Sequence, residues 1–304
     1  MVPAEPVIHI DDRDVVKPDG YKFEALGIVR DGSESSATKN VYKKGCHVTE
    51  ACVLTASNHP VSIFSHIHSS LEKDYKSANT ITLHAIEQGA ALFGKATFAM
   101  DREYDDNKMF LKLDELDQDY VIRLTAKRKL LYHNKWTMAP ELRNRRKGKV
   151  KTSVFYKGKE HEAYLSHVKV QITASKKDIY LMLVYGITEH PMMLATNKEI
   201  KSKDDVIRVA RTYFSRWKVE EYFRCKKQMF QFEKFRVRKL KAVNALNFYI
   251  SLCMAFPAVI SMESETNALK VSIIQTANPV KEKVFLCYYR LAKGIYGILS
   301  YAKE

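Results

Sequence analysis

The chain has 304 residues, and its 50 Lys and Arg against 35 Asp and Glu give a formal net charge of +15. With 46% apolar residues and only 11 Gly and 8 Pro, it is neither a disordered nor a collagen-like chain, and it can bury a sizeable core. The strong positive charge favours a polyanionic partner, above all nucleic acid.

The cysteines and the apolar segments indicate the cellular compartment of the protein and whether it spans a membrane. Five cysteines without any Cys-x-x-Cys pair argue against a disulfide framework or a zinc ribbon and favour a reducing compartment. The first residues, Met-Val-Pro-Ala-Glu-Pro, lack the basic and apolar regions of a signal peptide. The uncharged stretch 242–262 contains Asn244, Asn247 and Pro257, so we expect a buried helix there rather than a membrane span.

Strand signals come first along the chain. Val7–Asp12 is a short apolar run that ends in two acids, which predicts a buried strand with carboxylates at its C-terminal end. His47–Thr55 and Val61–His68 are rich in β-branched residues and are separated by the turn signal Asn58-His-Pro60. These two runs predict an antiparallel hairpin.

Helices and strands then alternate. The predicted elements are, in order, helix Asn79–Phe93, strand Ala96–Met100, helix Asn107–Leu116 and strand Tyr120–Thr125. Such alternation predicts an α/β fold with a mixed sheet and flanking helices. Asp101 follows the first of these strands directly, as Asp11 and Asp12 end the earlier one. We therefore expect the acids at one edge of the sheet, where sites form in open α/β folds.

The sequence pattern changes from helical to strand-like over residues 126–200. Helical signals vanish, and strand-like runs such as Val168–Thr173 and Ile179–Tyr185 predict a β-rich insertion. The basic run Arg143–Lys151 is expected at its tip, where it fits a solvated loop and phosphate contacts about equally well. The candidate DNA contacts in this run are Arg143, Arg145, Arg146 and Lys147.

Helical signals return after the insertion. Ser202-Lys-Asp-Asp205 looks like a capping box that opens a long helix, which we expect to run to about Gln231. Leu240–Met262 and Lys281–Leu291 also have helical patterns. We therefore divide the chain into a core segment 1–125, the insertion 126–200, a core-completing helical segment 201–232 and a helical C-terminal region 233–304.

Four polar side chains share one face of the predicted long helix. Tyr213, Arg216, Glu220 and Lys227 have offsets of 0, 3, 7 and 14 residues, which at 100° per residue fall at roughly 0°, 300°, 340° and 320°. A salt-bridged surface face accounts for Arg216 with Glu220, but not for the alignment of the other two.

This spacing, Tyr-x2-Arg-x3-Glu-x6-Lys, resembles the signature of the Tyr-Arg-Glu-Lys (YREK) group of bacterial insertion-sequence DDE transposases. Asp101-Arg-Glu-Tyr-Asp105 and Ile10-Asp-Asp-Arg-Asp-Val15 are similar to two further blocks of that family, so the resemblance covers about residues 7–250. Members usually carry a helical DNA-binding region before the first acid, whereas this chain begins about ten residues before it. The resemblance therefore implies an N-terminally truncated copy or half of a split reading frame.

The resemblance implies an RNase H-like core, a mixed five-stranded sheet with flanking helices, interrupted by the β-rich insertion and followed by the helical C-terminal region. It implies Asp11, Asp101 and Glu220 as catalytic residues that hold two Mg²⁺ ions, for which Mn²⁺ can substitute. Asp12 remains the alternative first acid, because neighbouring residues of a strand point to opposite faces.

The resemblance also implies DNA-contacting residues. Tyr213, Arg216 and Lys227 would bind backbone phosphates. Trp136 is the one Trp of the insertion and is a candidate for holding a flipped base, although simple packing is the plainer interpretation. The basic run Lys234–Lys241 directly follows the motif helix and is expected either to meet DNA or to form a solvated face.

The expected function is cut-and-paste transposition, with Mg²⁺-dependent cleavage at the ends of an insertion sequence and strand transfer into target DNA. The expected partners are double-stranded DNA with terminal inverted repeats, target DNA and a second copy of the chain in a synaptic complex, in the bacterial cytoplasm at the nucleoid and without a membrane. The alternative is a catalytically inactive, truncated remnant that acts only as a DNA-binding or dimerising inhibitor. A junction-resolvase-like nuclease is a third interpretation, against which the insertion and the four-residue motif argue.

Overall fold

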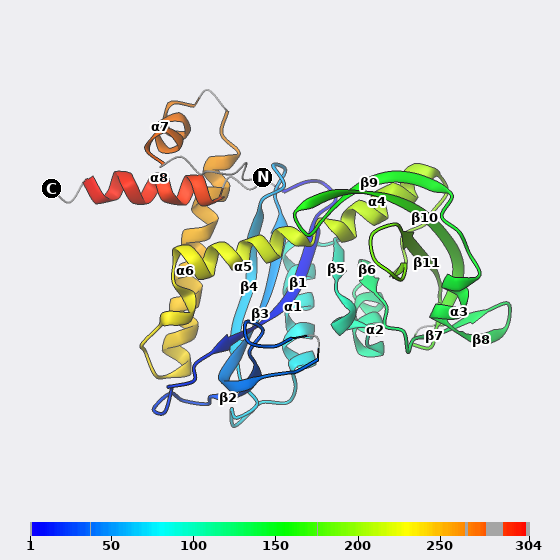
Figure 1. Ribbon diagram of the computed structural model, residues 1–304, viewed down its shortest axis with the longest axis horizontal. Helices are drawn as coiled ribbons and strands as arrows, with labels where there is room; N and C mark the ends of the chain where they lie inside the picture. Colours follow the sequence, from blue (N-terminus) through cyan, green and yellow to red (C-terminus); the bar gives the residue numbers. More distant parts are fainter. Residues whose placement is uncertain (1, 37, 175, 265–266, 278–287, 302–304) are drawn as a thin grey trace. The chain divides into compact units, whose positions relative to one another are not determined.

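The computed structural model describes residues 2–36, 38–174, 176–264, 267–277 and 288–301 of the chain. The chain forms two compact units, in which residues 1–4, 12–81 and 218–304 make the first unit and residues 5–11 and 82–217 make the second. Strand β1 (Val7–Val16) contributes its first half to the second unit and its second half to the first. Figure 1 shows the course of the chain through its elements.

The second unit is built on parallel strands that continue into antiparallel ones. The first half of β1 pairs in parallel with β5 (Thr97–Met100), and β5 pairs in parallel with β6 (Asp119–Arg123). Antiparallel strands follow β6 in the order β12 (Met192–Thr196), β11 (Asp178–Tyr185), β10 (Lys159–Ile172), β7 (Lys129–Tyr132) and β8 (Lys135–Met138), and β9 (Val150–Tyr156) also pairs with β10.

Helices cover this sheet by burying regularly spaced apolar residues. Helix α4 (Lys203–Phe214) buries Val206, Val209, Ala210, Tyr213 and Phe214, the i, i+3, i+4, i+7, i+8 pattern of one helix face, against apolar side chains of β6 and β9–β12. The predicted capping box at Ser202 and Asp205 is confirmed.

Helix α1 (Ala78–Phe93) approaches the parallel strands closely. A methyl group at Gly89 would lie 2.9 Å from Ile8 of β1 and 3.0 Å from Phe98 of β5, so the close packing needs glycine there. The second unit also contains η1 (Arg102–Tyr104), α2 (Asn107–Glu115) and the short α3 (Ala139–Asn144).

The first unit is built around a long hairpin. Strand β3 (Tyr42–Leu54) pairs antiparallel with β2 (Gly27–Arg30) and with β4 (Pro60–His68), and the second half of β1 lies beside it. The predicted hairpin is thus confirmed, and its turn places Asn58 at a φ of 61°.

Helices complete the first unit. Helix α6 (Leu240–Ser261) packs on β4, where the Asn244 side chain accepts from the Ile67 N–H at 2.8 Å and donates to the Ile67 carbonyl at 2.9 Å. The other helices are α5 (Trp217–Met229), whose first residue still belongs to the second unit, η2 (Phe232–Lys234), α7 (Ala268–Thr276) and α8 (Tyr288–Tyr301). Of the predicted helix Lys281–Leu291, residues 281–287 lie outside the described residues.

Three short-range expectations were wrong or incomplete. Strand β1 does not end at its acids but runs on to Val16. Its first half pairs with β5 and its second half with β3, which keeps the strand regular beyond Asp12. The Lys17 N–H still donates to the Lys44 carbonyl at 2.7 Å. Strand β2 and helix α3 were not predicted, since both are too short to show a clear pattern.

The predicted long helix is two helices. Helix α4 ends at Phe214 and α5 begins at Trp217, and between them the Arg216 N–H donates to the carbonyl of Tyr213, three residues back, at 3.1 Å. The Ser215 hydroxyl donates to the Thr212 carbonyl at 2.8 Å, which competes with regular helical bonding. The single helix face that the spacing predicts for Tyr213, Arg216, Glu220 and Lys227 is therefore wrong.

Helix α6 is only partly buried, contrary to the expectation for 242–262. It is long and apolar enough to cross a membrane by length and composition, and 33% of its most apolar window is buried. Large apolar side chains remain exposed on it, namely Leu246, Phe248, Tyr249, Leu252, Phe256 and Val259. A single helix of this kind is weak support for a membrane span, because core helices pass the same test.

Candidate active site

The first two acids lie on neighbouring parallel strands of the second unit. The register pairs Ile10 of β1 with Met100 of β5, so Asp11, the next residue on β1, lies beside Asp101, which directly follows β5. The same register pairs Met100 with Ile122, which makes Arg123 the next residue on β6. Three adjacent strands therefore present two carboxylates and one guanidinium at the same level.

Cations and a phenol surround the two carboxylates. The Arg216 Nη1 lies 3.5 Å from the Asp11 Oδ1, and the Arg123 Nη1 lies 3.6 Å from the Asp101 Oδ1. The Tyr213 hydroxyl donates to the Asp101 Oδ1 at 3.1 Å. The last turn of α4 and the turn after it thus bring Tyr213 and Arg216 to the acids from a distant part of the chain. We call Asp11, Asp101, Arg123, Tyr213 and Arg216 the acid cluster.

These neighbours decide the ionisation of Asp101. Burial by itself raises the pKa of Asp101, but the Arg216 charge, the Arg102 backbone N–H, Arg123 and the Tyr213 hydroxyl together hold that pKa below its usual value. Burial and the Asp101 charge raise the pKa of Tyr213, so the phenol stays a neutral donor at physiological pH. Asp101 is therefore ionised at neutral pH, and its carboxylate oxygens can accept hydrogen bonds or bind a cation.

A buried histidine holds the turn that carries Arg216. The His9 Nε2 lies 3.0 Å from the Ser215 Oγ, and His9 is on the same face of β1 as Asp11, two residues away. Because the Ser215 hydroxyl gives its proton to the Thr212 carbonyl, the His9 Nε2–H is the donor in this pair. This contact fixes the end of α4 close to β1.

The remaining motif residues belong to the first unit. Asp12 points to the face of β1 opposite to Asp11. Glu220 lies in the first turn of α5. The Lys227 Nζ lies 2.7 Å from the Glu233 Oε2, and its side chain is 57% exposed. Its neighbour Lys226 is instead fully buried, and its Nζ lies 2.9 Å from the Glu50 Oε2.

The candidate DNA contacts of the insertion lie on its surface elements. Trp136 on β8 is 49% exposed and so is not a core residue. Arg145 lies 3.6 Å from Glu141, and Arg146 donates to the Tyr132 hydroxyl at 3.1 Å. Arg143 donates to the Asn144 side chain at 3.0 Å, and Lys147 is exposed. The basic run is therefore partly helix and partly turn, and it enters strand β9 at Val150.

The acid cluster suits a divalent cation in part. Carboxylate oxygens are the donors that Mg²⁺ prefers, and Asp11 and Asp101 offer two such groups, one of them held ionised. Within the part of the chain that the structure describes, no three His, Cys, Asp or Glu side chains gather closely enough to hold a metal ion. Asp11 and Asp101 therefore fit as two of the ligands.

Sequence reasoning missed Arg123, Glu50 and Lys226. Arg123 belongs to no motif. It follows the apolar run Tyr120–Ile122 as Asp101 follows its own apolar run, and this could have placed both at the same edge of the sheet. Glu50 and Lys226 lie 176 residues apart, and a lysine in a charged helix gives no sign of burial.

The comparisons with known proteins add one finding. The family model described as "Transposase DDE domain" matches residues 5–256, a range that includes the acid cluster, α5 and most of α6. Among curated proteins no match is found.

Proposed function

Since the chain belongs to the transposase DDE-domain family, we propose that it cuts DNA at the ends of an insertion sequence and joins those ends to target DNA. The family as a whole consists of DNA-binding transposases that use divalent metal ions. The observation that carries the finer proposal is the register of β1 and β5, which sets Asp11 beside Asp101.

We propose that β1, β3, β4, β5 and β6 are the five strands of an RNase H-like core. The chain order supports this assignment, because a strand and a hairpin precede α1, and β5, α2 and β6 follow it. Segments 1–125 and 201–232 would then form the core, interrupted by the β-rich insertion 126–200 and followed by the helical region 233–304.

The chemistry is assigned to the three acids. We propose Asp11, Asp101 and Glu220 as the catalytic residues and as the ligands of two Mg²⁺ ions, for which Mn²⁺ can substitute, with Asp12 as the alternative first acid. When bound, such ions activate a water molecule and stabilise the leaving oxygen of a phosphodiester. The Arg216 charge, with Arg123 and Tyr213, favours the ionised form of Asp101, and Arg123 and Tyr213 also contact its carboxylate directly.

Phosphate binding is assigned to the basic side chains and the phenol of the motif. Tyr213, Arg216 and Lys227 are proposed to hold the DNA backbone near the acids. Arg216 is 13% exposed and contacts Asp11 from the turn after α4, so its guanidinium lies beside a proposed catalytic carboxylate.

The proposed partners follow from the reaction and from the charge. The net charge of +15 suits double-stranded DNA with terminal inverted repeats and target DNA. A second copy of the chain would complete a synaptic complex, and the bacterial cytoplasm at the nucleoid is the proposed location.

Glu220→Gln tests this function. The variant keeps the size and polarity of the side chain but removes the carboxylate. We expect Mg²⁺-dependent nicking of DNA that carries the element ends to fall by at least about 100-fold, because loss of even a supporting residue around a metal costs 10- to 100-fold. DNA affinity should be unchanged.

Glu221→Gln is the matched control, because Glu221 is the next residue on α5 and lies 2.6 Å from Arg224. Nicking by Glu220→Gln at the rate of the unaltered protein would refute the catalytic role of Glu220. If the unaltered protein binds these DNA ends but does not nick them with Mg²⁺ or Mn²⁺, the inactive DNA-binding inhibitor is the correct interpretation.

A further inference from the structure

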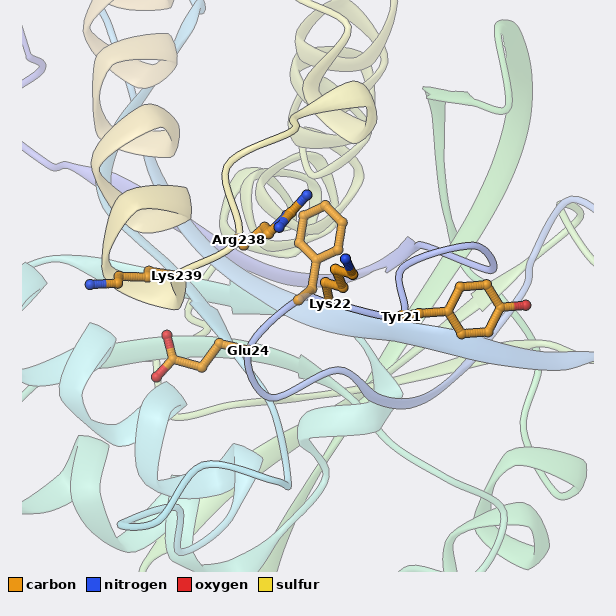
Figure 2. A pocket seen from close by; sticks show the side chains of 6 residues that line it. Tyr21, Lys22, Glu24, Arg238 and Lys239 are labelled. Carbon is orange, nitrogen blue, oxygen red and sulfur yellow. The ribbon is translucent and has the colours of Figure 1, made fainter.

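A basic concave surface lies in the first unit and contains none of the motif residues. Tyr21, Lys22, Phe23 and Glu24, from the loop between β1 and β2, line it together with Arg238 and Lys239, which precede α6. It encloses about 560 Å³ and is open to solvent. Figure 2 shows the labelled side chains of both segments, with Tyr21 and Lys239 extending in opposite directions at its two ends, and we call this surface the basic groove.

Hydrogen bonds hold the two walls of the basic groove together. The Glu24 N–H donates to the Arg238 carbonyl at 2.9 Å, and the Leu240 N–H donates to the Glu24 Oε2 at 2.8 Å. Below them the Lys17 Nζ donates to the Phe235 carbonyl at 3.0 Å and lies 4.0 Å from the centre of the Phe235 ring. The groove is therefore preformed.

The charge of the basic groove is strongly positive. Its one lining acid, Glu24, already accepts from the first backbone N–H of α6. The cations at the groove and on the adjoining chain are all exposed, and among the described residues none of them has an ion-pair partner; they are Lys22, Arg236, Arg238, Lys239 and Lys241. Such a set of cations attracts an anionic ligand with several charges.

An exposed aromatic ring stands among these cations. Tyr21 is 78% exposed, and the Lys44 Nζ lies 4.6 Å from the centre of its ring. Phe23 packs edge-on against Phe235, with 5.7 Å between the ring centres, which leaves Tyr21 as the ring offered to solvent. Exposed aromatic rings beside a basic groove are the arrangement that binds single-stranded nucleic acid, in which bases stack on rings and phosphates meet cations.

We propose that the basic groove binds an unpaired strand of DNA, with a base stacked on Tyr21 and phosphates held by Lys22, Arg238 and Lys239. This inference rests on the proposed function, because it takes DNA as the partner, and it adds a contact surface separate from the acid cluster. An acidic peptide would use the cations but has no need of the exposed ring.

The test measures binding of a labelled single-stranded oligonucleotide and of the duplex of the same sequence to the full chain, as a function of salt. For Lys22→Gln/Arg238→Gln we expect the slope of log affinity against log salt on the single strand to decrease by about 1.4, or about 0.7 per lost contact. For Tyr21→Ala we expect at least about 5-fold weaker single-strand binding with duplex binding unchanged, because stacking contributes 1–3 kcal/mol per base.

Two controls make the result specific. Lys73→Gln/Lys76→Gln removes the same charge from exposed lysines of the first unit that do not line the groove, and Tyr21→Phe keeps the ring. Both controls should bind single-stranded DNA like the unaltered protein. Unchanged thermal unfolding shows that each variant is folded.

Three outcomes would overturn the proposal. The first is equal binding by the groove double variant and the lysine control. The second is an equal loss of duplex and single-strand binding in Tyr21→Ala. The third is binding of a poly-glutamate peptide as tight as that of a single strand of equal charge, unaffected by Tyr21→Ala, which would identify an acidic protein partner. None of these assays requires cleavage. Their result is therefore independent of the result of the Glu220→Gln cleavage assay.

Discussion

The acid cluster of the second unit and the Glu50–Lys226 pair of the first both set carboxylates against cations, but they differ in access to solvent. Glu50 and Lys226 are fully buried, with 2.9 Å between the Glu50 Oε2 and the Lys226 Nζ. In the acid cluster the Asp101 side chain is 26% exposed and that of Asp11 is 12% exposed, and the guanidinium groups stand 3.5–3.6 Å from the carboxylates.

The surroundings of the buried pair explain its role. The Lys226 Nζ also donates to Ser65 at 3.3 Å and to Ser251 at 3.2 Å, and the Ser65 hydroxyl donates to Glu50 at 2.7 Å. Asn247 donates to Ser65 at 2.6 Å. Strands β3 and β4 and helices α5 and α6 therefore meet in one polar network, which fixes the helix that carries Glu220.

The difference shows which charges can act on a ligand. Neither member of a buried pair can bind a new partner without leaving an uncompensated charge inside the protein. Such a pair therefore has a structural role only. In the acid cluster both ion contacts are long and the Asp101–Arg123 pair is partly exposed, so a phosphate or a metal ion can replace that pair at lower cost. Three substitutions test this comparison.

The largest effect is expected from Lys226→Met, which leaves Glu50 charged and buried. Breaking a buried ion pair from one side costs about 3–5 kcal/mol of unfolding free energy. Urea unfolding at neutral pH measures this loss. The double variant Glu50→Leu/Lys226→Met should recover most of it, because it removes both charges. A single variant as stable as the unaltered protein would show that the pair does not support the fold.

A smaller effect is expected from Tyr213→Phe, which removes the hydroxyl that donates to Asp101. Hydrogen bonds to charged groups contribute about 1.5–3 kcal/mol, so the pKa of Asp101 should rise. The native pKa of Asp101 lies below its unfolded value, so its ionised form stabilises the fold above the unfolded pKa of about 3.9, and this stability is lost as the pH falls through the folded pKa.

In Tyr213→Phe this acid-range loss should therefore be smaller and should be complete at a higher pH, as measured by NMR titration of the Asp101 carboxyl and by unfolding between pH 5 and 2. Tyr120→Phe is the control, because the buried Tyr120 hydroxyl makes no hydrogen bond within the described residues. An unchanged Asp101 pKa in Tyr213→Phe would remove the phenol from the acid cluster.

The smallest effect on stability is expected from Lys227→Ala, one residue from Lys226. Its exposed pair with Glu233 should contribute at most about 0.5 kcal/mol. If Lys227 binds a phosphate, the salt dependence of duplex binding should still decrease, by a slope of about 0.9. A slope equal to that of the unaltered protein would exclude Lys227 from the DNA contacts.

Local sequence signals predicted most of the elements that surround the acids. The hairpin of β3 and β4, helices α1 and α2, strands β5 and β6 and the capping box of α4 were all expected close to their observed places. Asp101 was expected directly after a buried strand, and β5 ends at Met100. Hydrophobic periodicity and turn residues act over a few residues, which is why they were sufficient here.

The sequence by itself determined the type and order of these elements and the residues of the motif. Tertiary structure alone decided that β1 continues past Asp12, that α4 ends before Arg216, that Arg123 reaches Asp101 and that Lys226 is buried against Glu50. Each of these depends on a partner from a distant part of the chain. The free energy of burying a charge or of extending a strand is set by that partner, and no local pattern records it.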